Sequence, residues 1–139
     1  MDDIAENDPM TEAIIAAAIE VHRHLGPGML ESAYEECLAI ELRSRGFKVE
    51  RQVVLPLIYK GNPIDNAYRL DMIVNGTVVL ELKAIDKVLQ VHEAQLTSYL
   101  RMSGYTLGLL INFHVPVLYK EIRRRVNSHK PVLQSSPSS

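Results

Sequence analysis

The spacing of apolar residues along the chain predicts three helices. Residues 10–25 carry apolar side chains at helical intervals, and Asp8 followed by a proline is a typical helix start. Gly26 and the proline after it cannot continue this helix, so we expect it to end there. The same spacing, closed in each case by a glycine, predicts two further helices over residues 29–45 and 91–102.

Apolar runs between and after these helices predict strands. Pro56 lacks an N–H group, which confines this end of the first strand to a sheet edge or a strand terminus, and residues 59–63 are typical of a turn. Residues 105–113 are apolar on both faces, as in a central strand. This order of elements predicts an α/β domain with a mixed central β-sheet flanked by helices. The predicted strands cover residues 47–57, 68–74, 78–84, 105–113 and 117–126.

The chain of 139 residues is long enough for one domain with its own core. We expect that domain over residues 9–126, after a flexible acidic start at residues 1–8 and before a disordered Ser/Pro tail at residues 127–139. The single cysteine, Cys37, excludes an internal disulfide. An acidic start without a long apolar run is unlike a secretory signal or a membrane span, so we expect a cytoplasmic protein that enters no membrane.

The formal net charge is −2 at pH 7, which argues against a uniformly basic nucleic-acid coat. This net charge is still compatible with a groove that is locally basic. Charge runs are usually solvated, but two groups of basic residues are the phosphate contacts to test if nucleic acid binds. They are Arg43, Arg45, Lys48 and Arg51 in the first group and Lys120, Arg123, Arg124 and Arg125 in the second.

The Asn75-Gly76 pair predicts a hairpin, and its register decides where the charged residues lie. A two-residue loop would mix core and charge on both faces. A three-residue loop over residues 74–76, with the glycine in a left-handed bulge, places Asp71 opposite Val79 and diagonal to Glu81, roughly 7–8 Å away at the backbone. Six apolar residues then share the other face. They are Leu70, Met72, Val74, Val78, Leu80 and Leu82.

The charged face of this hairpin holds Asp71, Glu81 and Lys83. Such a face is usually just solvated. Ile73 and Val79 lie on it as well, however, and charged groups among apolar neighbours are costly unless they are paired or bind a metal. Two carboxylates this close can share one divalent cation.

The acidic hairpin and the helix after it together carry a family motif. The pattern resembles the PD-(D/E)XK nuclease superfamily, and its Gln-x-x-x-Tyr helix resembles the exonuclease branch. The superfamily proline before the aspartate is here Leu70. The motif residues are Asp71, Glu81, Lys83, Gln95 and Tyr99.

A second motif lies at the start of the second predicted helix. Gly28, Glu31 and Tyr34 have the spacing of the GxxExxY motif, which names a small bacterial family assigned to the same superfamily. The resemblance covers about residues 10–125. It implies a restriction-endonuclease-like fold.

The resemblance also implies a metal-dependent active site. Asp71 and Glu81 would hold Mg²⁺ (or Mn²⁺) with the backbone carbonyl of Leu82, and hard cations of this kind prefer oxygen ligands. Lys83 would orient or deprotonate the attacking water, with a salt bridge to a carboxylate as its alternative role. Glu31 would reach the metal, through a water or directly; its alternative role is to complement the helix dipole.

Three further residues are expected to support this site. The Gln95 amide would bind a phosphate oxygen or a ligand carboxylate, and Tyr99 lies on the same helix face. Tyr34 is expected to be packed, with a hydrogen-bonded hydroxyl. We expect Glu31 to lie within reach of the cluster because the second helix should cover the polar face of the hairpin.

Three functions remain open at this point. The first is a Mg²⁺-dependent nuclease acting on nucleic acid, DNA in preference to RNA. The second is a nucleic-acid- or protein-binding module on the same fold, either as a monomer or as a homodimer. The third is a small-molecule enzyme with the same metal site. The complete set of Glu31, Asp71, Glu81, Lys83 and Gln95 favours the first, and the acidic net charge favours the second.

Overall fold

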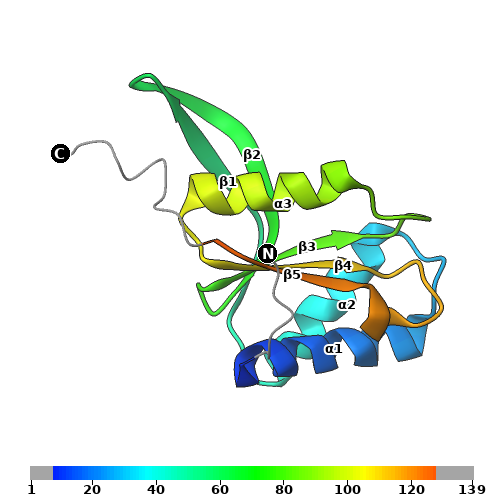
Figure 1. The fold of residues 1–139 in the computed structure, drawn as a ribbon. Helices are drawn as coiled ribbons and strands as arrows, with labels where there is room; N and C mark the ends of the chain where they lie inside the picture. Colours follow the sequence, from blue (N-terminus) through cyan, green and yellow to red (C-terminus); the bar gives the residue numbers. More distant parts are fainter. Residues whose placement is uncertain (1–7, 128–139) are drawn as a thin grey trace.

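Within residues 8–127, which the computed structural model describes, helices and strands follow one another nearly as predicted (Figure 1). All but one residue each of the flexible start expected at residues 1–8 and of the disordered tail expected at residues 127–139 lie outside the described residues. The elements are α1 (Pro9–Leu25), α2 (Glu31–Ser44), β1 (Val49–Tyr59), β2 (Asn62–Val74), β3 (Val78–Lys83), α3 (Gln90–Ser103), β4 (Leu107–Asn112), the 3₁₀ helix η1 (Leu118–Glu121) and β5 (Ile122–Val126).

The sheet has the strand order β1-β2-β3-β4-β5. Its pairs are antiparallel except for β3 and β4, which are parallel and are joined by the crossover helix α3. Helices α1 and α2 cover one face and α3 covers the other (Figure 1). This confirms the predicted mixed sheet flanked by helices, with β1 at an edge, one of the two positions that Pro56 allows, and β4 buried on both faces.

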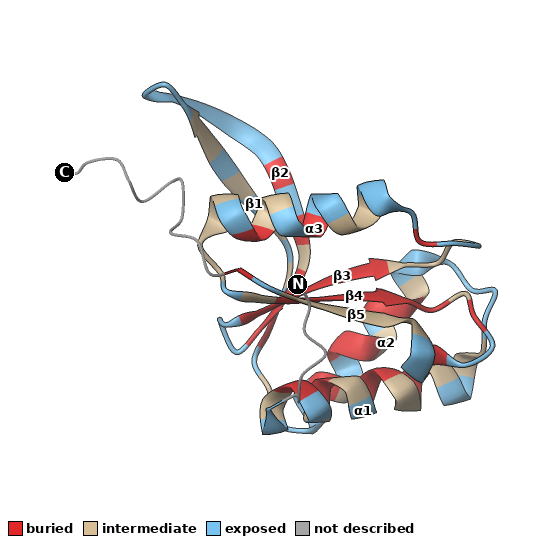
Figure 2. Ribbon diagram, viewed as in Figure 1, coloured by how far each residue is buried: buried red, intermediate tan, exposed pale blue. Residues whose placement is uncertain are grey.

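Each face of the sheet has its own core (Figure 2). On the α1/α2 face, Tyr34 and Leu38 pack against Leu80 and neighbouring strand residues. On the α3 face, Leu96 packs against Val79 and its neighbours. A side chain at Gly108 would lie 2.9 Å from the Leu96 side chain, so glycine lets α3 sit directly on β4.

Local chemistry explains the ends of the first helix. The Asp8 carboxylate accepts a hydrogen bond of 2.7 Å from the Thr11 N–H and caps α1, and Gly26 ends it with a φ of +69°.

Two boundaries differ from the prediction. Helix α2 begins at Glu31, two residues later than predicted. Asn127, which we placed in the tail, is buried, and its side-chain amide donates to the carbonyl of Leu100.

The hairpin loop lies one residue later than predicted, which moves each cross-strand partner by two residues. Val74 pairs with Val78, so the loop spans residues 75–77 instead of 74–76. In this register Val79 lies opposite Ile73 and not, as predicted, opposite Asp71. Both Val74 and Val78 are buried, and this burial favours keeping Val74 in the strand.

The predicted apolar face of six residues is also only partly right. Five of the six lie in the α1/α2 core, but Leu70 lies in the α3 core with Ile73. The side chains of Leu70 and Met72, two positions apart, therefore point to opposite faces, which a regular strand does not allow. Strand β2 is irregular at the residue between them, Asp71.

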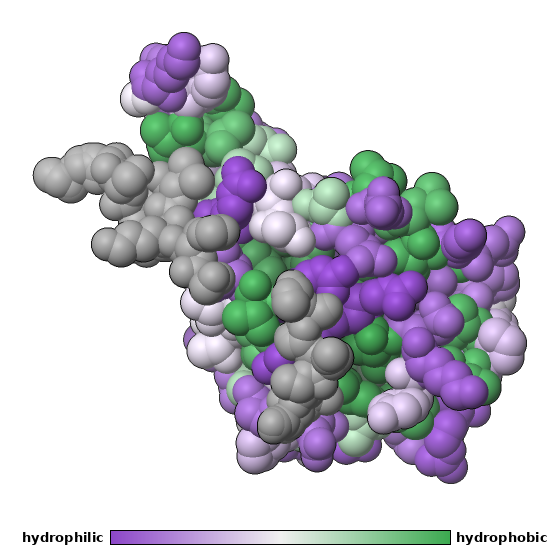
Figure 3. All heavy atoms as spheres, in the orientation of Figure 1, coloured by the Kyte–Doolittle hydropathy of each residue, from purple (hydrophilic) through white to green (hydrophobic). Residues whose placement is uncertain are grey.

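Strands β1 and β2 continue as a long hairpin, here called the β1–β2 arm (residues 53–69), whose outer part projects from the domain (Figure 1). Strand β2 begins six residues before the predicted start, and the predicted turn narrows to Lys60 and Gly61, both with positive φ. Apolar side chains are exposed along the arm below its hydrophilic tip (Figure 3). They include Val54, Tyr59 and Ile64.

The last predicted strand, residues 117–126, is two elements. Leu118 is buried in the α1/α2 core at the start of the 3₁₀ helix, and only Ile122–Val126 pairs with β4. No helix among residues 8–127 is long and apolar enough to cross a bilayer.

Candidate active site

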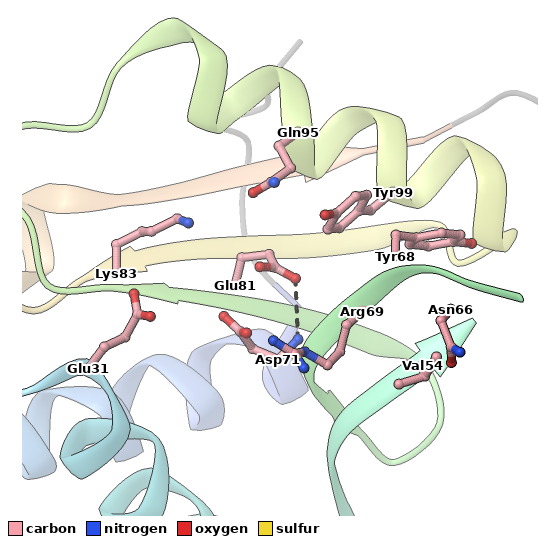
Figure 4. Close-up of a pocket in the computed structure, with 10 residues that line it drawn as sticks. All are labelled: Glu31, Val54, Asn66, Tyr68, Arg69, Asp71, Glu81, Lys83, Gln95 and Tyr99. Atoms are coloured by element: carbon pink, nitrogen blue, oxygen red, sulfur yellow. Dashed lines mark hydrogen bonds between the residues drawn. The ribbon is translucent and has the colours of Figure 1, made fainter. Parts of the chain in front are cut away.

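A hollow of about 540 Å³ opens where β2 and β3 part, between α3 and the start of α2 (Figure 4). It brings together all five residues of the predicted catalytic set, which come from α2, β2, β3 and α3. The lining residues are Glu31, Val54, Asn66, Tyr68, Arg69, Asp71, Glu81, Lys83, Gln95 and Tyr99.

Asp71 and Glu81 are held by backbone N–H groups of each other's strands. The Leu82 N–H donates to Oδ2 of Asp71 at 2.9 Å, and the Asp71 N–H donates to Oε2 of Glu81 at 3.3 Å. Backbone pairing between β2 and β3 stops one residue earlier, at Met72 and Leu80. Side-chain bonds thus replace the ladder at the point where the strands diverge.

This arrangement places two carboxyl groups in a poorly solvated position. Glu81 is only 4% exposed. Burial, followed by the negative charge of Asp71 and a hydrogen bond between the two carboxyl groups, raises the pKa of Glu81 to about 8, while Lys83 acts in the opposite direction. Without a bound cation, the pair is therefore stabilised by a proton.

Glu31 adds a third carboxylate at the edge of the same hollow. Burial and then the charge of Asp71 raise the pKa of Glu31, and Lys83 lowers it. The expected placement of Glu31 is confirmed, but the reason we gave is wrong. Helix α2 covers the face opposite to α3, and its first turn brings Glu31 to the open end of the sheet beside Lys83 (Figure 4).

Gln95 and Tyr99 reach into the hollow from α3 (Figure 4). They lie one turn apart on the same face of the helix. Burial, followed by the charge of Glu81, raises the pKa of the Tyr99 hydroxyl. The ring of Tyr99 rests 5.0 Å from that of Tyr68, centroid to centroid. The two α3 side chains thus offer polar groups above the carboxylates.

Tyr34 lies outside the hollow and supports it from below. Its ring is buried and stacks on Phe113 at 4.5 Å between centroids. Its hydroxyl donates to the Gly26 carbonyl and accepts from the Met29 N–H at 3.1 Å. This agrees with the expected packed residue with a bonded hydroxyl. The hydroxyl closes the loop that leads into Glu31.

The two predicted basic groups do not line the hollow. Several of their members are paired with acids of the protein itself, which would compete with the phosphate contacts that we named for testing. The pairs are Arg45 with Glu41 at 2.8 Å, Arg51 with Glu35 at 3.0 Å, Arg123 with Glu93 at 3.2 Å, and Arg125 with Glu93.

The sequence reasoning missed the wall that the β1–β2 arm contributes. Arg69 and Asn66 line the hollow from this arm, and Arg69 extends toward Asp71 (Figure 4). The spacing of Arg69 two positions before Asp71, which would place both on one side of a strand, was an available signal. The sequence around Asn66 carries no such signal, because the position of this residue depends on how the arm folds over the site.

The side chains that line the hollow offer part of a site for the expected metal. Among residues 8–127, no three His, Cys, Asp or Glu side chains come close enough to form a complete protein cage. Mg²⁺ usually binds through one or two carboxylates and keeps several waters, so Asp71 and Glu81 are a suitable partial set. A divalent cation would also replace the proton that the pair otherwise needs.

Comparison with known proteins gives one finding for this chain. A family model of the PD-(D/E)XK nuclease superfamily matches residues 8–125, which include every helix and nearly every strand residue. The search of curated proteins and the search of solved structures give no match. The match is at superfamily level, so the assignment to the GxxExxY family stays a prediction.

Proposed function

Because the chain belongs to the PD-(D/E)XK nuclease superfamily, whose domains generally hydrolyse phosphodiester bonds, we propose that it is itself a metal-dependent nuclease. Its substrate is DNA in preference to RNA, and its metal is Mg²⁺ or Mn²⁺. The observation that carries the proposal is the buried Glu81 beside Asp71, facing a hollow that also holds Lys83. We place the chain in the GxxExxY branch on the motif of Gly28, Glu31 and Tyr34.

Asp71 and Glu81 hold the metal in this proposal, with the Leu82 carbonyl as a third ligand. In a strand, the N–H and C=O of one residue point to the same side. The Leu82 N–H points to Asp71, so its carbonyl does too, whereas the next carbonyl, of Lys83, accepts from Phe113 on the other side. Glu31 completes the set through a water.

The bound metal would supply Lewis acidity to the phosphate and lower the pKa of a water. The protein's own groups do the rest. Lys83, on the same side of β3 as Glu81, orients the attacking water and offsets phosphate charge. Gln95 and Tyr99 donate to phosphate oxygens from α3.

A non-catalytic binding module remains the second candidate. The ion pairs that hold members of both basic groups, together with the net charge of −2, favour it because they reduce the positive charge that these groups offer to a phosphate backbone. The same facts suit a nuclease that is brought to its substrate by a partner.

The deciding experiment is cleavage of a panel of single- and double-stranded DNA and RNA with and without Mg²⁺ or Mn²⁺. We expect metal-dependent cleavage by the wild type, and its loss by a factor of about 10²–10⁴ in Lys83→Ala, which removes the group that positions the water. Lys87→Ala, an exposed lysine outside the hollow and outside both basic groups, is the matched control. A folded, metal-loaded wild type that cuts nothing on this panel would favour the binding module.

A further inference from the structure

A second buried carboxylate, Glu35, lies on α2 outside the hollow. Its residue is 7% exposed, and it is absent from the hollow's lining. Burial of an ionised carboxylate is costly unless it is paired and hydrogen-bonded. Both oxygens are used: Oε2 accepts from Nε of Arg51 at 3.0 Å, and Oε1 accepts from Nε2 of Gln52 at 2.7 Å. Glu35 therefore accepts hydrogen bonds from two consecutive residues of β1.

The second of these residues has an unusual backbone for a strand. Gln52 has a φ of +52°, the left-handed region that side chains other than glycine rarely adopt. A strained residue of this kind persists only where its surroundings hold it. The bond from Gln52 to Glu35 is such a restraint.

Gln52 occupies the register position across from Asp71. The β1–β2 pairs run from Arg51 with Met72 to Val53 with Leu70 and leave out the pair between them. This is also the place where β2 changes face, since Leu70 and Met72 belong to opposite cores. The left-handed residue and the irregularity at Asp71 thus form one local feature of the strand pair.

Glu35 connects this feature to the rest of the site. It lies one helical turn after Glu31, so the same helix presents Glu31 to the hollow and restrains the strand pair at Asp71. We infer that Glu35 is a positioning residue: through Gln52 it fixes the bend that turns the Asp71 carboxylate toward the Leu82 N–H and Glu81. The inference rests on the proposed function only in taking Asp71 as a metal ligand.

The first test compares Glu35→Gln with Glu41→Gln in the full chain. Glu41 is a carboxylate of the same helix that pairs with Arg45 away from the hollow. Loss of a residue that orients a metal ligand typically weakens metal binding about 10- to 100-fold, and we expect this for Mn²⁺ in Glu35→Gln, measured by calorimetric titration. Glu41→Gln should bind Mn²⁺ like the wild type.

A second readout needs no metal. The Leu82 amide donates to Asp71, so its hydrogen exchange, followed by NMR, reports where the Asp71 carboxylate lies. In Glu35→Gln we expect this amide to exchange about tenfold faster relative to the Leu110 amide in the centre of β4, as for the loss of one hydrogen bond to a charged group. The ratio separates a local change from a general loss of stability.

The second test uses the backbone of residue 52. Glycine adopts positive φ without strain, whereas valine resists it. Gln52→Gly should therefore keep Mn²⁺ affinity and Leu82 protection near the wild type, and should restore most of both in the Glu35→Gln background. Gln52→Val should lose both, as Glu35→Gln does.

These outcomes decide the inference independently of cleavage. Unchanged Leu82 exchange and Mn²⁺ affinity in Glu35→Gln would overturn it, and so would Gln52→Gly behaving like Gln52→Val. A wild type that binds Mn²⁺ and cleaves no substrate would contradict the proposed function and leave the positioning role supported. A wild type that binds no Mn²⁺ would contradict the proposed metal site, and Leu82 exchange alone would then decide the role of Glu35.

Discussion

The β3–β4 pair and the β1–β2 arm are both rich in apolar residues, but only the first is packed on two faces. Strands β3 and β4 keep one unbroken register from Val78 to Lys83, between two helical layers. In the arm, the register shifts between Leu55 and Leu57, and the residues beyond the shift belong to neither core. The arm is largely exposed, while the centre of the sheet is buried (Figure 2).

The candidate site lies where these two regions meet. Inside the β3–β4 pair, backbone groups bond to neighbouring strands and are not available to a ligand. At the junction, the amides of Asp71 and Leu82 bond to carboxylates instead. A polar site can therefore form beside a buried core without interrupting the central pair.

We expect the largest effect on the free energy of unfolding when a buried side chain of the β3–β4 pair is truncated. Leu80→Ala removes a fully buried side chain and should lower the free energy of unfolding by about 2–5 kcal/mol. Ile64→Ala, in the arm and 44% exposed, should change it by less than about 0.5 kcal/mol. Urea unfolding measures both. Equal losses would show that the arm is as much a part of the folding core as β3.

The next largest effect on the free energy of unfolding is expected where the β3–β4 pair meets the arm, and it depends on pH. The pKa of Glu81 rises from 4.5 to about 8 on folding, so between these values the folded chain holds a proton that the unfolded chain has released. The free energy of unfolding should therefore fall, on the order of a few kcal/mol in total, as pH rises from about 5 to 8 without metal. Urea unfolding across this range tests it.

Two variants identify the group responsible for this slope. Glu81→Gln cannot titrate and should flatten the dependence, whereas the exposed Glu50→Gln should keep it. Asp71→Asn should reduce it, because the charge of Asp71 helps to raise the pKa of Glu81. Persistence of the full slope in Glu81→Gln would assign it to another group.

The two regions also differ in how far the sequence predicts them. Helices α1 and α3 and the central strands follow from local periodicity, which their packing reinforces. The register of the 75–77 loop did not follow, because Val74 suits a strand and a loop equally until its burial is known. The length of the arm was missed because Asn62 and Pro63 are typical of loops and are held in a strand only by pairing across the hairpin.

The same division applies to the site residues. Asp71, Glu81 and Lys83 could be found because they lie on two adjacent strands, and Glu31 and Gln95 because a family motif includes them. Arg69 and Asn66 belong to no motif and meet the site through the arm. Glu35 could not be recognised, since its role depends on the backbone of Gln52 in another element.

A smaller effect is expected below the hollow, at Tyr34. Tyr34→Phe keeps the ring stacked on Phe113 but removes the two hydroxyl bonds, so stability should fall by about 1–2 kcal/mol. Tyr59→Phe, on the exposed arm, is the control and should be neutral. Thermal and urea unfolding compare the two. A neutral Tyr34→Phe would mean that its hydroxyl does not secure the loop before Glu31.

The smallest effect on stability, and the sharpest on binding, is expected for Arg69 in the arm. Its side chain is exposed and makes no ion pair within residues 8–127, so Arg69→Ala should change stability by less than about 0.5 kcal/mol. If Arg69 contacts the DNA, the same change should weaken DNA binding. It should also reduce the slope of log affinity against log salt concentration by the amount that corresponds to about one phosphate contact. Fluorescence anisotropy at several salt concentrations, with Ca²⁺ in place of Mg²⁺, measures this.

Lys60→Ala provides the matched control for that change. Lys60 is the cation at the tip of the same arm, away from the hollow, and its ammonium lies over the ring of Tyr59. If DNA lies in the hollow, Lys60→Ala should bind it like the wild type, because the tip does not reach the phosphates held near Asp71. A larger loss in Lys60→Ala than in Arg69→Ala would place the nucleic acid at the tip. The arm would then be a separate binding element and not a wall of the active site.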